Sequence, residues 1–149
     1  MSGYSNVTFD EIEIGATASA ERVVGQTEIE ALLLVSGDVV PFNLVEGVTV
    51  EPRDLCVEAV AAEAIISGML ERRLPGPGTR IVSQQLEFNG VIRVGDLVRA
   101  TVTVREKTAG NRSVLFDCTV DAAGATVPRG TVVVAAPHRQ ASFPAPAGA

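Results

Sequence analysis

The chain has 149 residues, 46% of them hydrophobic and 20% charged, which is typical of one globular domain with its own core. A formal charge of −6 and an aromatic content of 4% argue against nucleic-acid binding, which relies on clustered cations and base stacking. No apolar run reaches the roughly 18 residues of a membrane helix, and no signal-peptide pattern opens the chain, so we expect a soluble, cytoplasmic protein without a membrane partner.

The first predicted elements are a strand over residues 17–25 and a helix that begins at Thr27. Thr27 and Glu30 have the spacing of a capping box, in which a hydroxyl and a carboxylate each accept a free backbone N–H. Gly37 is a suitable C-terminal stop. Between these signals lies an apolar stripe of Ile29, Leu32 and Leu33.

The stretch SGDVVPFNL, residues 36–44, follows this helix and allows two interpretations. Ser, Gly, Asp and Pro are ordinary residues of a helix stop and turn. The same stretch places a carboxylate, Asp38, and an amide, Asn43, on one loop, as a catalytic loop would. The residue pattern alone leaves both interpretations open.

A second predicted helix begins near Asp54, a good N-cap, and runs to about Arg73. It is apolar on nearly every face, which favours a helix buried on all sides or wrapped by a sheet. Its small residues would let strands approach closely; they are Ala59, Ala61, Ala62 and Ala64. The stretch LPGPGT, residues 74–79, then ends the helix in a turn.

Four strand-like runs follow, and in one of them Val98, Ala100, Val102 and Val104 alternate with polar residues. That period of two is typical of a half-solvated antiparallel strand. The runs are residues 80–90 with a bend at 91–95, 97–107, 113–121 and 131–137. The sum is an α+β fold in which an antiparallel sheet of five or more strands wraps a long helix. We expect one domain over residues 1–140 and a flexible tail over 141–149.

Several of these segments together resemble the MaoC-like (R)-specific enoyl-CoA hydratase and dehydratase family, which has the hot-dog fold. They are TFDEIEIGATAS, the SGD loop, ISGMLERRLPGPGT, SQQLEFNGVIRVGDLVRATVTVREK and GTVVVAAP, and the resemblance covers about residues 8–137. It implies an acyl-CoA or acyl-carrier-protein thioester as substrate and no cofactor or metal. The open sheet edge fits at least a homodimer, or a larger or heteromeric assembly.

Family members carry the loop pattern Asp-x-Asn-Pro-x-His and a His-Gly pair that opens the central helix. Here Asp38 and Pro41 match, but Asn43 stands in place of the histidine, and Glu58-Ala59 stands in place of His-Gly. An amide has no useful proton affinity near neutral pH, so Asn43 can orient water but cannot accept its proton. The resemblance thus implies a diverged site.

We therefore expect Asp38, Asn43 and Glu58 to be the catalytic residues, with Asp38 as base and Glu58 as a second carboxyl. The resemblance implies that the substrate contacts Val40, Pro41, Phe42, Ala59 and Val60, with the Ala59 N–H holding the thioester oxygen. The alternatives are structural roles: Asp38 is a turn residue, and Glu58 only caps its helix.

The remaining reactive side chains are expected to be structural. Cys56 and Cys118 match no metal spacing and lie in apolar or strand-like runs, so we expect buried thiols. His138 follows the last strand and is expected to be solvated. Two other functions stay open: a non-catalytic acyl-thioester-binding protein or dehydratase subunit, and an isomerase or thioesterase that uses the same cleft.

Overall fold

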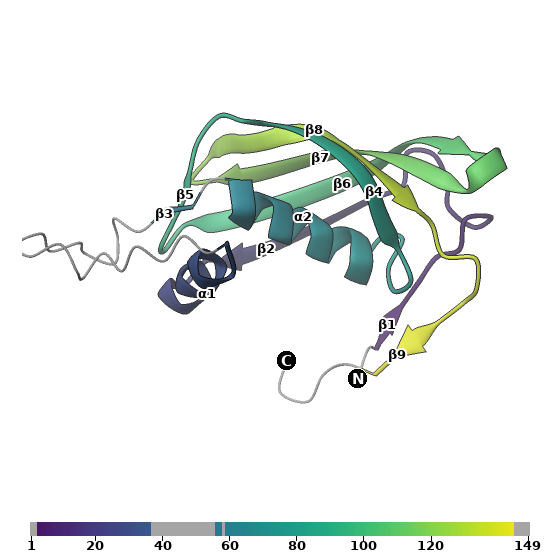
Figure 1. Ribbon diagram of the computed structural model, residues 1–149, viewed down its shortest axis with the longest axis horizontal. Helices are drawn as coiled ribbons and strands as arrows, with labels where there is room; N and C mark the ends of the chain where they lie inside the picture. Colours follow the sequence, from purple (N-terminus) through teal and green to yellow (C-terminus); the bar gives the residue numbers. More distant parts are fainter. Residues whose placement is uncertain (1–2, 37–55, 58, 145–149) are drawn as a thin grey trace, which may run out of the picture.

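The computed structural model describes residues 3–36, 56–57 and 59–144. An antiparallel five-stranded sheet forms one layer, and a long helix, α2 (Ala59–Arg72), lies across its inner face (Figure 1). The strands stand in the order β2 (Thr17–Val23), β6 (Leu97–Thr108), β7 (Ser113–Ala122), β8 (Ala125–Ala135) and β4 (Arg80–Phe88). The predicted α+β class and the minimum of five strands are confirmed.

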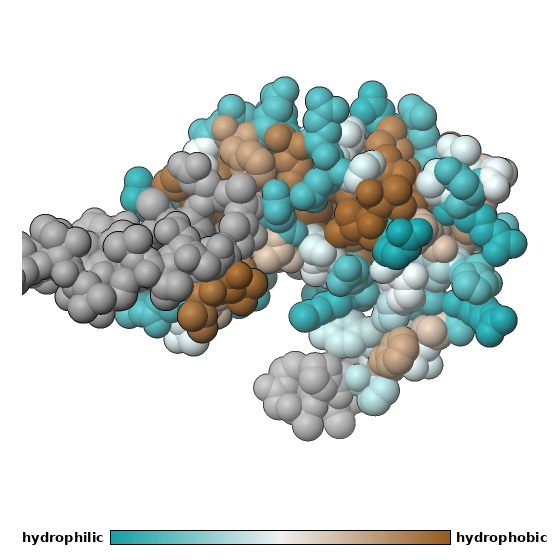
Figure 2. Space-filling view, viewed as in Figure 1, coloured by the Kyte–Doolittle hydropathy of each residue, from teal (hydrophilic) through white to brown (hydrophobic). Residues whose placement is uncertain are grey.

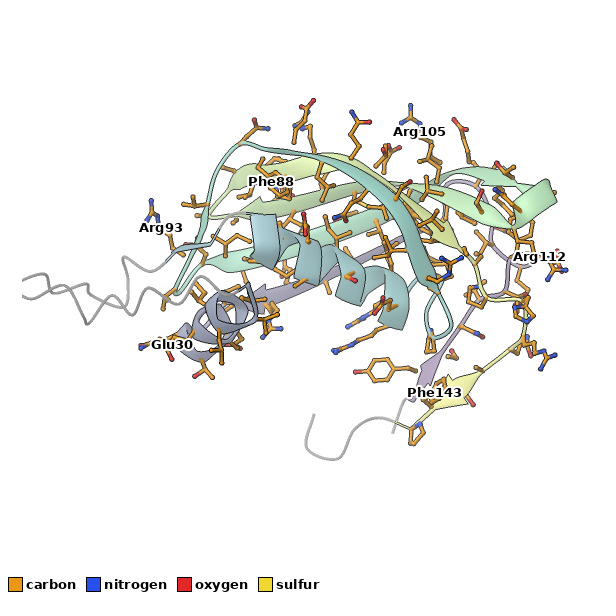
Figure 3. The ribbon with its side chains drawn as sticks, in the orientation of Figure 1. Glu30, Phe88, Arg93, Arg105, Arg112 and Phe143 are labelled. Atoms are coloured by element: carbon orange, nitrogen blue, oxygen red, sulfur yellow. The ribbon has the colours of Figure 1, made fainter. Side chains whose placement is uncertain are left out.

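Shorter elements complete the molecule. Helix α1 (Gln26–Ser36) packs against α2. Strand β3 (Cys56–Val57) pairs with β5 (Ile92–Arg93), and β1 (Tyr4–Ser5) pairs with β9 (Ser142–Phe143). A single 3₁₀ turn (Ala109–Asn111) connects β6 to β7. Figure 3 shows Arg93 near the left end of the molecule, Arg112 near the right end, and Phe143 of β9 below the sheet.

The core lies between the inner face of the sheet and α2. Every second residue of β6, from Val98 to Val104, is buried, as the period of two predicted. Val114, Phe116, Cys118 and Val120 continue the pattern on β7. These side chains pack against Ala61, Ile66, Met69 and Leu70 of α2, so sheet and helix form one hydrophobic cluster.

The start of the second helix differs from the prediction. It was expected near Asp54, but α2 begins at Ala59, and Cys56 and Val57 instead pair with Arg93 and Ile92. This pairing joins residues that are distant in sequence, so no local signal near Asp54 reveals it. The apolar segment expected to be all helix is therefore part strand and part helix.

Smaller differences occur at other ends of elements. Helix α1 begins at Gln26 rather than Thr27, and the Glu30 carboxylate accepts a hydrogen bond of 2.7 Å from the Gln26 side chain. Strand β8 begins at Ala125 rather than residue 131, because Pro128 and Gly130 remain paired with β4. Within the segment predicted as a tail, residues 142 and 143 form β9; the domain boundary after residue 140 stays a prediction.

Candidate functional site

The predicted catalytic residues lie outside the described residues. Asp38, Asn43 and Glu58 are all in this group, as are three of the substrate-binding candidates, Val40, Pro41 and Phe42. The other two candidates, Ala59 and Val60, are the first residues of α2. Their roles, like those of the catalytic candidates, stay predictions. What the structure describes is the elements on either side of the predicted catalytic loop.

The flanks of the predicted catalytic loop lie at one end of the molecule. Helix α1, which ends at Ser36, contacts both α2 and β3. Strand β3 immediately precedes α2 and is held by its pairing with β5. Figure 3 accordingly shows Glu30 of α1 and Arg93 of β5 toward the same end of the molecule. The chain therefore leaves α1 and enters α2 on the same side.

The N-terminus of α2 has the chemistry of an oxyanion-binding group. The first four N–H groups of a helix have no partner within the helix, and the helix dipole places partial positive charge there. Ala59 is the first residue of α2, so its backbone N–H belongs to this set. A carbonyl oxygen that gains negative charge would be stabilised at this position.

A groove of about 710 Å³ runs along one side of α2. Its floor consists of small and apolar side chains from β2, β6 and α2, and α1 forms its opposite wall. The α2 residues that line it recur at intervals of three and four, so they occupy one face of the helix. They are Ala61, Ala64, Ile65, Gly68, Met69 and Arg72.

A second, smaller hollow of about 410 Å³ lies on the other side of α2, against the edge strand β4. Glu63 and Ser67 of α2 line it together with Ser83 and Gln84 of β4. Figure 2 shows hydrophobic surface where β4 crosses in front of the sheet, and Val82 of β4 is 53% exposed. Among the described residues this side of α2 is thus open, and of the two arrangements that the sequence favoured, burial on all sides or wrapping by a sheet, only the second is compatible with it.

The reactive side chains that the structure describes have structural roles. Burial, reinforced by the negative charge of Asp117, raises the pKa of Cys118 to about 12, so this buried thiol stays protonated at neutral pH. The prediction of a core thiol is confirmed for Cys118. His138 is exposed, as expected. Across the described ranges, no cluster of three or more His, Cys, Asp and Glu could hold a metal ion.

Sequence reasoning missed the large groove entirely. Its lining comes from five separate elements, and most of the lining residues are small or apolar and therefore read as ordinary core. The available signal was Gly68, a glycine inside a predicted helix. A Cβ built on Gly68 has no neighbour within 4 Å among the described residues, so packing against them does not require glycine there.

Comparison with known proteins gives a consistent set of relatives, although no family model matches. An (R)-specific enoyl-CoA hydratase from Rhodospirillum rubrum is 32% identical over 133 residues, which cover 88% of this chain and 92% of that protein. A 3-hydroxybutyryl-CoA dehydratase from Methylorubrum extorquens is 27% identical over 91% of this chain and 88% of its own.

Solved structures agree with this set. The unliganded R-hydratase PhaJ1 from Pseudomonas aeruginosa has a TM-score of 0.82 and 26% identity, covering 95% of this chain and 93% of its own. The ChsH1–ChsH2 complex from Mycobacterium tuberculosis has a TM-score of 0.68 at 15% identity, covering 84% of this chain and 98% of its own, a likeness of fold alone.

Among the helices that the structure describes, none has the length and apolar character to cross a membrane.

Proposed function

We propose a hydratase or dehydratase function, because the chain belongs to the MaoC-like family of (R)-specific enoyl-CoA hydratases and dehydratases and has its hot-dog fold. In this function the protein adds water to enoyl thioesters or removes it from 3-hydroxyacyl thioesters. The observation that carries the proposal is the similarity to a hydratase at 32% identity over 88% of this chain. The substrate is an acyl group carried on coenzyme A or on an acyl-carrier protein.

The proposed site combines the start of α2 with the loop before it. Asp38 follows α1 by two positions, and Glu58 directly precedes Ala59, the first residue of α2. The contact of α1 with α2 and β3 supports a short distance between these two carboxylates. Two nearby carboxylates repel each other when both are charged, which separates their pKa values and divides base from acid.

In the proposed reaction, Asp38 takes a proton from water, and the water oxygen forms a bond to C3 of the enoyl group. The electrons of the C2–C3 double bond move toward the thioester oxygen, where the Ala59 N–H holds the developing charge. Protonated Glu58 then gives its proton to C2, and Asn43 orients the water. After the product leaves, Asp38 releases its proton and Glu58 takes one up, which restores the site for the next turnover. Dehydration is the reverse sequence.

The direct test is hydration of crotonyl-CoA and longer enoyl-CoA substrates by the purified chain. Asp38→Ala should lower the rate about 100-fold or more, because general-base catalysis contributes on that order. Asp10→Ala removes an exposed carboxylate from a turn and is the matched control. Equal rates for Asp38→Ala and the unmodified protein would rule out Asp38 as the base.

The replacement of the family histidine by Asn43 favours a second candidate, an acyl-thioester-binding protein or subunit without catalysis of its own. Calorimetric binding of an acyl-CoA with no turnover would support this candidate. Release of free thiol from acyl-CoA would instead indicate a thioesterase, and movement of the double bond without water addition would indicate an isomerase.

The edge strand β4 supports a homodimer as the assembled state. Its central residues, 81–86, carry no charge, and edge strands without charges readily pair with another chain. The opposite edge, β2, is charged: its Arg22 binds Glu28, and its Glu21 binds Arg99. We therefore propose that β4 pairs with β4 of a second copy, which would also cover the smaller hollow beside α2.

Val82→Lys should weaken this dimer, because the exposed valine would become a charge at the proposed interface. Val23→Lys is the matched control, since Val23 is 60% exposed but lies on β2, the other edge. We expect sedimentation to show a shift toward monomer for Val82→Lys and none for Val23→Lys. A dimer that survives Val82→Lys but dissociates with Val23→Lys would place the interface at β2.

A further inference from the structure

The large groove beside α2 has the shape of a site for an elongated molecule. Its volume of about 710 Å³ lies within the range of small-molecule sites. The lining face of α2 extends from Ala61 to Arg72, a length of about 16 Å at the helical rise per residue. Figure 2 shows the surface hollowed between α1 and the β1–β9 pair.

The lining of the groove is apolar along most of its length. Ala20 of β2 and Ala100 of β6 form part of the floor, and Ile65 and Met69 of α2 add larger apolar side chains. An unbranched aliphatic chain would exchange water for these surfaces, and each methylene group buried in this way favours binding.

Of the charged side chains that line the groove, the carboxylates have ion-pair partners in the described part of the chain and two arginines do not. Glu28 accepts a hydrogen bond of 2.7 Å from Arg22, and Glu21 accepts one of 2.6 Å from Arg99, so both lining carboxylates are neutralised by arginines. Arg72 and Arg73, at the C-terminal end of α2, make no ion pair among the described residues. The uncompensated charge of the lining is therefore positive and located at one end.

Tyr4 also lines the groove, and its strand is tied to this end of α2. The Val7 N–H donates a hydrogen bond of 2.7 Å to the carbonyl of Pro75, just beyond the helix. A phenol hydroxyl can donate a hydrogen bond to an anion. The lining of the groove thus includes two guanidinium groups and a hydroxyl donor, a combination that suits a carboxylate.

Gly68 adds an independent observation. Glycine in the middle of a helix costs stability relative to alanine. Within residues 3–36, 56–57 and 59–144, a Cβ on Gly68 would meet nothing within 4 Å, and Gly68 lines the groove. The missing side chain therefore widens the groove without serving any contact within the described part of the fold.

From these observations we propose that the groove binds a medium-chain fatty carboxylate, separately from the thioester site at the start of α2. The aliphatic chain lies along the α2 face past Gly68. The carboxylate lies between Arg72, Arg73 and Tyr4. The proposal concerns the opposite side of α2 from the β4 hollow and does not depend on hydratase activity.

Calorimetric titration of the full chain with octanoate, decanoate, dodecanoate and decanol tests this site. We expect affinity to increase about fourfold per methylene, and decanol to bind more weakly than decanoate. Arg72→Gln and Arg73→Gln should each weaken decanoate binding about two- to fivefold, as for exposed ion pairs. Arg129→Gln, on an exposed strand position outside the groove, is the matched control.

Gly68→Leu should weaken decanoate binding at least tenfold by filling the groove, while Gly68→Ala, which removes little volume, should have a small effect. Asp38→Asn should leave decanoate binding unchanged. The proposal is overturned if the unmodified protein does not bind decanoate, if the arginine variants bind it normally, or if Asp38→Asn abolishes binding. A Gly68→Leu protein that folds but sediments as a smaller assembly would show that a second copy occupies the groove, which also overturns it.

Discussion

Phe116→Ala should lower the free energy of unfolding by about 3–5 kcal/mol, the range for loss of a buried aromatic side chain. Phe116 has no exposed surface and lies on the inner face of β7, opposite Val104 of β6 and Val132 of β8. All three side chains belong to the core that α2 covers. Because native proteins are stable by only about 5–15 kcal/mol, this is a large share of the total.

Denaturant unfolding measures this effect, with all variants at one fixed protein concentration so that the contribution of assembly is the same in each measurement. The matched control is Leu97→Ala, because Leu97 is 54% exposed on the neighbouring strand β6. We expect a change below about 1 kcal/mol for the control. Similar losses for the two variants would mean that the inner face of the sheet is not the principal core.

The central strands could be predicted from sequence because one local property determines them. Alternation of apolar and polar residues places Val98, Ala100, Val102 and Val104 on a single face of a strand, and all four are buried. No distant residue is needed for this inference. Cys118 was predicted to be a core thiol because it lies in a strand-like run, and it is buried on β7.

The ends of elements were harder to predict because they depend on distant partners. Asp54 looks like an N-cap, yet α2 begins at Ala59, after a β3 strand that exists only through pairing with β5. Gly130 looks like a strand breaker, yet it belongs to β8. A Cβ there would lie 2.8 Å from the Leu86 Cα of β4, so glycine permits the close approach of the two strands.

The two candidate sites also differ in how much of each can be predicted from sequence. Asp38 and Asn43 were predicted from resemblance to a loop motif, and Glu58 from resemblance to the residue pair that opens the central helix; a sequence shows both features directly. The groove beside α2 depends on the juxtaposition of α1, α2, β2 and β6 and on the missing side chain of Gly68. A sequence shows the glycine but not the empty space beside it.

Asn43→His should raise the rate of enoyl-CoA hydration about 100- to 10,000-fold, the usual contribution of a well-placed general base. The family pattern pairs the aspartate with a histidine at this position, and this chain keeps Asp38 and Pro41 of that pattern. A neutral imidazole accepts a proton from water, which an amide cannot do. The gained rate should fall as the pH drops below about 6.5, because the imidazole then becomes protonated.

Two further variants locate the source of this gain. Asn43→Gln keeps an amide and should bring no increase, so a similar increase would show that side-chain size rather than basicity matters. Asp38→Asn combined with Asn43→His should lose most of the gain, because residues that act on one water do not contribute independently. If Asn43→His folds and binds acyl-CoA but hydrates no faster than the unmodified chain, residue 43 does not face the reacting water. The carboxylates Asp38 and Glu58 would then carry the acid–base chemistry in the variant, as proposed for the unmodified chain.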